Sequence, residues 1–199
     1  MRWIAPIFAS LALPVSAADL SVIVDRADDG VEIFVKFATA DTEEVLAPFP
    51  PGFLDAEGLV DIAPFRNGTY EMGDEMWAGV STEIGGEDAI VEAMSMMVHP
   101  DSIPVDFEDP IDGWIAMAVC NVTDPNARFG LEELSTYAGF FAYKVDGYAP
   151  ISLVFPTDID VEVTEFLLGR ELSTASLTVG PNAPLELDAV TRWERIRFW

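Results

Sequence analysis

The chain has 199 residues, with 35 acidic and 10 basic side chains and a formal net charge of -25 at pH 7. A single cysteine excludes an intrachain disulfide, a cysteine-based zinc module and an iron–sulfur cluster, and a single histidine excludes a blue-copper site. Nucleic acid is not expected as a partner, because phosphate binding needs clustered Lys and Arg side chains. Half of the residues are hydrophobic, which argues against intrinsic disorder.

The N-terminus has the pattern of a secretory signal peptide. Arg2 gives a positive start, residues 4–13 are apolar, and residues 15–17 (Val-Ser-Ala) resemble a cleavage site. We therefore expect residues 1–17 to be removed and residues 18–199 to form one exported domain. No later apolar run approaches the roughly 18 residues of a spanning helix, so no transmembrane segment is expected after the signal peptide. An uncleaved N-terminal anchor is the alternative.

Apolar residues at every second position begin after the leader. This spacing predicts one strand from Leu20 to Val24 and a second from Val31 to Phe37. The connecting segment 27–30 ends in Asp-Gly, a pair that tolerates the positive φ of tight turns. We expect a β-hairpin with one buried face.

The middle of the chain is less regular. A short helix is expected from Asp41 to Leu46, and an irregular section rich in Pro, Gly and polar residues covers about 48–112. Within this section, Glu87 to Val98 is predicted to form a helix, because its apolar residues fall on one helical stripe. Pro100 would end that helix.

Strand signals return in the last third. Residues 115–119 alternate as a strand and residues 131–138 suggest a short helix. Two more strands, 139–145 and 151–155, flank an Asp-Gly turn. A further strand at 159–163 turns at Gly-Arg into another at 173–179. Short strands separated by turn residues predict a mainly β protein, an antiparallel β-sandwich with one or two short helices.

A group of soft side chains is the most specific candidate site. Met94, Met96, Met97 and His99 lie close together in the sequence, and thioether and imidazole ligands suit Cu(I). On the predicted helix, Met96 and His99 are three residues apart and would share a face. The alternative is that the methionines fill the core and that His99 stabilises a helix C-terminus.

Aromatic side chains offer a second candidate. Tyr70 and Trp77 lie in the irregular section, and Trp193 and Trp199 belong to an Arg- and Trp-rich C-terminal segment. Exposed rings of this kind can bind a small ligand or a partner protein. For the segment 192–199 we favour a closing strand over a tail that docks on a partner or a membrane surface.

The acidic side chains do not single out a catalytic pair. A glycosidase-like hydrolase needs two facing carboxylates, and 35 candidates allow many such pairs by chance. We therefore expect a non-catalytic binding or accessory protein of the bacterial periplasm or extracellular space, whose partner is an unknown protein or small ligand. A periplasmic Cu(I) carrier is the first alternative and a carboxylate-based hydrolase is the second. Apart from possible copper, no cofactor is expected.

Overall fold

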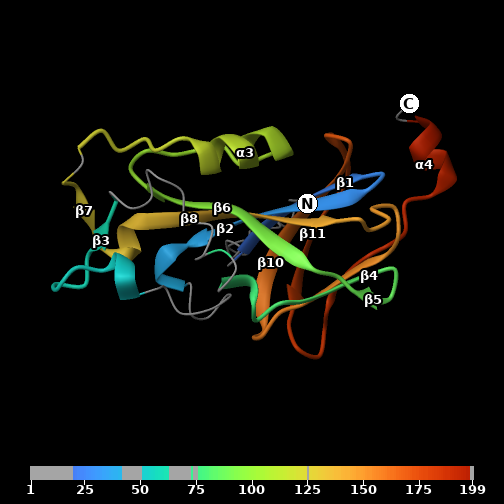
Figure 1. The fold of residues 1–199 in the computed structure, drawn as a ribbon, viewed down its shortest axis with the longest axis horizontal. Helices are drawn as coiled ribbons and strands as arrows, with labels where there is room; N and C mark the ends of the chain where they lie inside the picture. Colours follow the sequence, from blue (N-terminus) through green and yellow to red (C-terminus); the bar gives the residue numbers. More distant parts are fainter. Residues whose placement is uncertain (1–19, 42–50, 63–72, 74–75, 125, 198–199) are drawn as a thin grey trace, which may run out of the picture.

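The computed structural model describes residues 20–41, 51–62, 73, 76–124 and 126–197. About half of these residues are in strands, which build two large sheets and one short sheet (Figure 1). The predicted mainly β class with short helices is confirmed. In chain order the elements are β1 (Leu20–Ala27), β2 (Gly30–Ala38), η1 (Thr39–Asp41), η2 (Pro51–Phe53), β3 (Val60–Asp61), β4 (Ser81–Ile84), β5 (Glu87–Asp88), β6 (Val91–Pro100), α3 (Pro110–Ala118), β7 (Arg128–Phe129), η4 (Leu131–Glu133), β8 (Leu134–Tyr143), β9 (Ile151–Val154), β10 (Ile159–Leu167), β11 (Arg170–Val179), β12 (Leu185–Leu187) and α4 (Arg192–Arg197).

The larger sheet has the strand order β11-β10-β1-β2-β8-β6, and the smaller sheet has the order β12-β9-β4-β5. Two of the three hairpins expected from turn chemistry are present: β1 pairs with β2, and β10 pairs with β11. The third is wrong, because the strands on either side of the Asp146-Gly147 turn, β8 and β9, lie in different sheets. Leu168 and Gly169 supply the positive φ angles of the second turn. A parallel pairing of β1 with β10 joins these hairpins, although all other strand pairs are antiparallel among the described residues.

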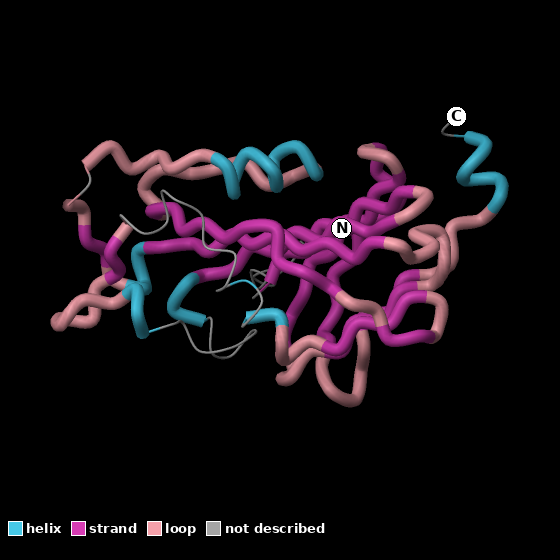
Figure 2. The backbone as a smooth tube through the Cα atoms, in the orientation of Figure 1, coloured by secondary structure: helices cyan, strands magenta, loops and turns pink. Residues whose placement is uncertain are grey.

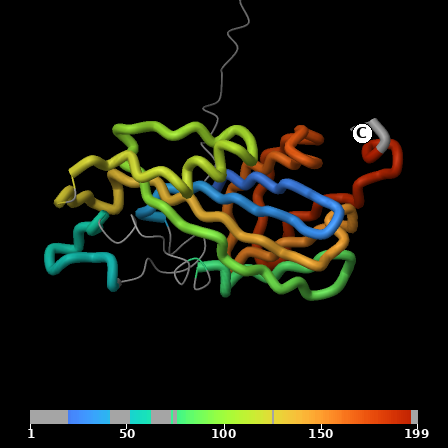
Figure 3. Tube along the Cα trace, turned by 45° about the horizontal axis from the view of Figure 1, so that its top comes forward, coloured from blue at the N-terminus to red at the C-terminus, as the bar shows by residue number. Residues whose placement is uncertain are grey.

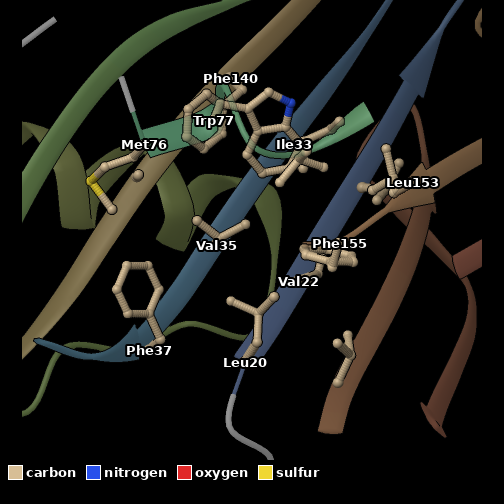
Figure 4. Packing of buried hydrophobic residues seen from close by; sticks show 14 of the residues in the cluster. Leu20, Val22, Ile33, Val35, Phe37, Met76, Trp77, Phe140, Leu153 and Phe155 are labelled. Carbon is tan, nitrogen blue, oxygen red and sulfur yellow. The ribbon is translucent and has the colours of Figure 1, made fainter. Parts of the chain in front are cut away.

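One hydrophobic core lies between the two large sheets. Alternate residues of β1 and β2 point into it, and they meet side chains of β4, β9 and β12. Figure 4 shows Ile33 and Phe140 of the larger sheet on one side of this core and Leu153 and Phe155 on the other. The Trp77 ring packs against Phe140 at a centroid distance of 4.3 Å. The N- and C-terminal hairpins therefore share an interior, as the alternation predicts.

The helix α3 covers the outer side of the larger sheet (Figure 2). Ile23, Phe34 and Phe166, whose side chains point away from the main core, form a second apolar cluster with Met117 of this helix. The molecule is thus layered as small sheet, large sheet and helix. Among the described residues, no helix has the length and apolar character needed to cross a bilayer.

A buried arginine ties the two sheets together at the end of β1. Arg26 Nε lies 2.5 Å from Glu165 Oε1 on β10. Its remaining nitrogens donate to the carbonyl oxygens of Gly147 (3.3 Å), Ala149 (2.6 Å) and Asp188 (3.0 Å), which precede β9 and follow β12. Burial lowers the pKa of the guanidinium, and Glu165 partly offsets this effect, so the charge is retained through specific partners.

Several sequence-based predictions of local structure are wrong. The expected helix 87–98 is the short strand β5 followed by β6, and the expected strand 115–119 lies largely within α3. The expected helix 131–138 is a single 3-10 turn, η4, before β8, and the C-terminal segment forms the helix α4 rather than a strand. The helix expected from Asp41 to Leu46 stays a prediction: Asp41 is the last residue of the 3-10 turn η1, and residues 42–46 lie outside the described residues, as does the predicted signal peptide.

A β-bulge explains the false helical pattern in β6. The pairing of β6 with β8 shifts between Ala93 and Ser95, so that Met94 is an extra residue. Ala93 and Met96 therefore both lie on the core side of the sheet, although they are three residues apart, and Met97 also belongs to the main core cluster. Met94 packs instead against the apolar cluster on the α3 side. A spacing of three is also the spacing of a helical face. The irregular section predicted over about 48–112 consequently includes a ten-residue strand.

Candidate functional site

The helix α3 begins at a well-formed N-terminal cap. The Asp109 side chain accepts hydrogen bonds from the backbone N–H groups of Ile111 (2.8 Å) and Asp112 (2.9 Å), and Pro110 occupies the first turn. The helix ends at Val119, whose backbone N–H donates to the Ile115 carbonyl at 3.1 Å. This Asp-Pro start is the sequence signal that identifies a helix here in place of a strand.

The inner side of α3 fits closely against the sheet. Gly113 lies so near β2 that a Cβ atom at this position would be 2.7 Å from the Phe34 ring. Met117 similarly lies over Gly139 of β8, and a Cβ atom added to this glycine would clash with Met117 Sδ. Small residues on both partners thus allow close helix–sheet contact, and the position of α3 is fixed.

The outer side of α3 is also apolar, which is unusual for a helix on a protein surface. We define the α3 apolar face as Ile111, Trp114, Ile115 and Val119, whose exposed fractions range from 43% to 67%. The first three are spaced i, i+3 and i+4 and so lie together on the helix. They were not among the candidates from sequence analysis, because the alternation of Ile115, Met117 and Val119 favoured a strand.

Trp114 in this face is held in one orientation. Its indole N–H donates to Glu32 Oε2 on β2 at 3.1 Å, and its ring contacts Phe34 edge to face at 5.9 Å between centroids. Burial raises the pKa of Glu32, while the hydrogen bond from Trp114 lowers it and limits this shift. The ring is therefore an exposed aromatic group that has already lost much of its side-chain freedom.

The proposed Cu(I) ligands are divided by the larger sheet. Residues 94–99 are in a strand, so Met96 and His99 point to opposite sides and the expected shared helical face is wrong. Met96 is in the main core. Met94 and Met117 both lie over Gly139. A Cβ atom added to this glycine would be 3.2 Å from Met94 Cε. The Cu(I) hypothesis remains a prediction, and only ligands on the α3 side could act together.

His99 is buried between β6 and α3. Its Nε2 donates to the Ala116 carbonyl oxygen of α3 at 2.6 Å, and its ring contacts Tyr137 edge to face at 5.1 Å. Nδ1 has no hydrogen-bond partner among the described residues. Burial lowers the pKa of His99, because a proton on Nδ1 would be a buried charge without an acceptor. His99 thus stabilises the last turn of a helix, but not the helix predicted from the sequence.

The other aromatic candidates do not come together. Trp77 is buried and its Nε1 donates to Thr82 Oγ1 at 3.3 Å, which makes it a core residue. Trp193 is exposed on α4. Tyr70 and Trp199 lie outside the described residues. In the described part of the chain, no three His, Cys, Asp or Glu side chains are arranged to hold a metal ion.

Comparisons with protein-family models, curated proteins and solved structures gave no significant match to this chain. The geometry of the surface therefore carries the functional argument.

Proposed function

We propose that this is a non-catalytic accessory protein, exported to the periplasm or the extracellular space, that binds a partner protein through the α3 apolar face. The observation that supports this proposal is the clustering of exposed apolar side chains. Of nine large hydrophobic residues exposed in the described part of the chain, four belong to this one face. Contiguous apolar surface of this kind is typical of interaction sites.

The surroundings of the face indicate the chemistry of the partner. Carboxylates border it at Glu32, Glu108, Asp109 and Asp112, in a chain of net charge -25. A complementary surface has an apolar centre and a basic rim, since such a rim steers association and avoids like-charge repulsion. A second copy of this acidic chain and an anionic membrane both fit less well. Trp114, already oriented by Glu32, is the expected anchor residue.

Site-specific photocrosslinking in cells tests the proposal. A photoreactive amino acid at position 115 should give one discrete adduct whose mass is not a multiple of this chain. Position 90 is the matched control, because Ile90 is 77% exposed but lies outside α3. Combining the crosslinker at 115 with Trp114→Ala should reduce the adduct by at least about tenfold, the loss expected for an aromatic anchor. Equal adducts at positions 90 and 115, or none at 115, would contradict the proposal.

A further inference from the structure

The C-terminal strands, orange to red in Figure 3, lie together at one end of the molecule. β11 is the last strand of the larger sheet and β12 is the last strand of the smaller one. A cavity of about 320 Å³ lies between them. We call it the β11–β12 cleft, and its lining includes Glu165, Ser173, Ala175, Leu177, Leu187 and Asp188.

The strand β11 has a free edge along this cleft. It pairs with β10 on one side, and no described strand pairs with its other side. Its residues from 170 to 178 are all exposed or half-buried, so no described segment covers the strand. Between residues 172 and 178 it contains no proline and no charged side chain, the devices by which natural edge strands avoid further pairing.

The residues on the cleft side of β11 are suited to receive larger side chains. Ser173 and Ala175 pair with Glu165 and Val163 of β10 and are small, so they leave room between the sheets. Leu177 on the same strand and Leu187 on β12 supply apolar walls. A strand added to β11 would direct every second side chain into this space.

The charged groups of the cleft are carboxylates. Glu165, Asp188 and Glu194 line it, and no lysine or arginine is among the described lining residues. The nearby Arg26 guanidinium is fully buried and directed to Glu165 and to backbone carbonyls. Arg195 of α4 lies over the Tyr148 ring, with its guanidinium carbon 3.8 Å from the ring centroid. A ligand in the cleft therefore meets apolar walls with negative charge beside them.

We propose that the β11–β12 cleft binds an extended basic peptide segment, which adds to β11 as a further strand. Its backbone would pair with the free edge, and every second side chain would enter the cleft. Among these, aliphatic side chains would meet the apolar walls, and Lys or Arg side chains would lie near Asp188 and Glu194. This mode of recognition combines main-chain hydrogen bonds with pockets for alternate side chains. The site is independent of the α3 apolar face, which lies on the outer side of the larger sheet.

Binding of synthetic peptides, measured by fluorescence polarisation, tests this site. The probe is a labelled octapeptide with leucine, valine and lysine at every second position, which face the cleft, and threonine at the positions between them. Two controls match it: one replaces lysine with glutamate, and the other keeps all side chains but carries N-methyl groups on alternate backbone nitrogens. We expect the probe to bind with a dissociation constant below about 100 μM and both controls to bind at least about tenfold more weakly.

Two substitutions in adjacent positions of β11 locate the binding. Ala175→Phe fills the cleft, whereas Ser176→Phe places the same ring on the opposite side of the strand, where Ser176 is exposed. The first should weaken binding at least about tenfold and the second less than about twofold. Asp188→Asn should weaken binding about threefold, because it removes one carboxylate from the cleft. It changes only an exposed side chain and keeps the backbone carbonyl that accepts from Arg26, so it provides a test if Ala175→Phe fails to fold.

Three results would overturn the inference. Equal affinity for the N-methylated peptide would mean charge attraction without strand addition. Unchanged affinity in a folded Ala175→Phe variant, or in Asp188→Asn, would place the peptide elsewhere. A concentration-dependent dimer that Ala175→Phe abolishes, without peptide binding, would show that a second copy of this chain occupies the edge. Because the α3 face is untouched by these variants, the crosslinking at position 115 should persist in all of them.

Discussion

Replacing Arg26 with methionine tests how far a single buried charge holds the two sheets together. Methionine keeps a long apolar side chain but removes every donor, leaving Glu165 without its partner and three carbonyl oxygens without a charged donor. Removing one member of a buried ion pair costs about 3–5 kcal/mol, and we expect a loss in this range. That is a large part of the 5–15 kcal/mol by which a typical domain is stable.

Arg128 provides the matched control. It also pairs with carboxylates, at 3.1 Å from Asp61 and 3.9 Å from Asp55, but its side chain is 34% exposed, whereas that of Arg26 is 0% exposed. Arg128→Met should therefore cost less than about 1 kcal/mol. The two variants compare similar ion pairs that differ in their access to water.

Urea unfolding followed by tryptophan fluorescence and circular dichroism measures both losses. A second substitution, Glu165→Leu, in the Arg26→Met background should restore part of the stability, because it removes the unpaired carboxylate. Equal losses for Arg26→Met and Arg128→Met would refute the view that the buried guanidinium links the sheets. A double variant less stable than Arg26→Met alone would refute the view that the unpaired Glu165 carboxylate accounts for part of the loss.

Two further predictions concern packing and pH. Gly147→Ala should destabilise the protein by about 1–3 kcal/mol, because its Cβ would clash with the Ala27 carbonyl oxygen. Gly52→Ala, whose Cβ would have no described atom within 4 Å, should change stability by less than about 0.5 kcal/mol. Thermal unfolding of both variants checks this, and equal melting temperatures would contradict it. For His99, the folded-state pKa lies below the ordinary value of 6.5, so the unfolded chain takes up the proton first and stability falls as pH drops below about 6.5. His99→Gln, whose amide can still donate to the Ala116 carbonyl, should remove the part of this pH dependence that falls between the lowered pKa of His99 and 6.5. Stability measured against pH checks this, and a profile unchanged by the substitution would rule out His99 as the source.

Local patterns predicted the elements that depend on neighbouring residues. The β1–β2 hairpin follows from alternation and an Asp-Gly turn, and the β10–β11 turn follows from Gly169 with its positive φ. The same reasoning failed where a local feature changed the period, as the bulge at Met94 did. It failed again at α3, where residues alternate like a strand but the Asp109 cap and close packing on Phe34 favour a helix.

The candidate sites could not be predicted in the same way. Both faces of α3 are apolar in sequence, and only its docking on Phe34 and Gly139 decides which residues are left exposed. The β11–β12 cleft likewise depends on the order of strands within two sheets. Neither feature has a signature within one segment of the chain.

The amino-acid sequence by itself determined the mainly β class, the two hairpins and the strongly acidic surface, because side-chain alternation, turn conformation and charge act over a few residues. Tertiary structure alone decided that β1 pairs in parallel with β10, that β8 and β9 enter different sheets, and that Arg26 is buried beside Glu165. The β1–β10 and Arg26–Glu165 contacts join residues more than 100 positions apart, and the stability of the whole arrangement comes from the apolar area that the assembled sheets bury together. No short stretch of sequence can specify that area.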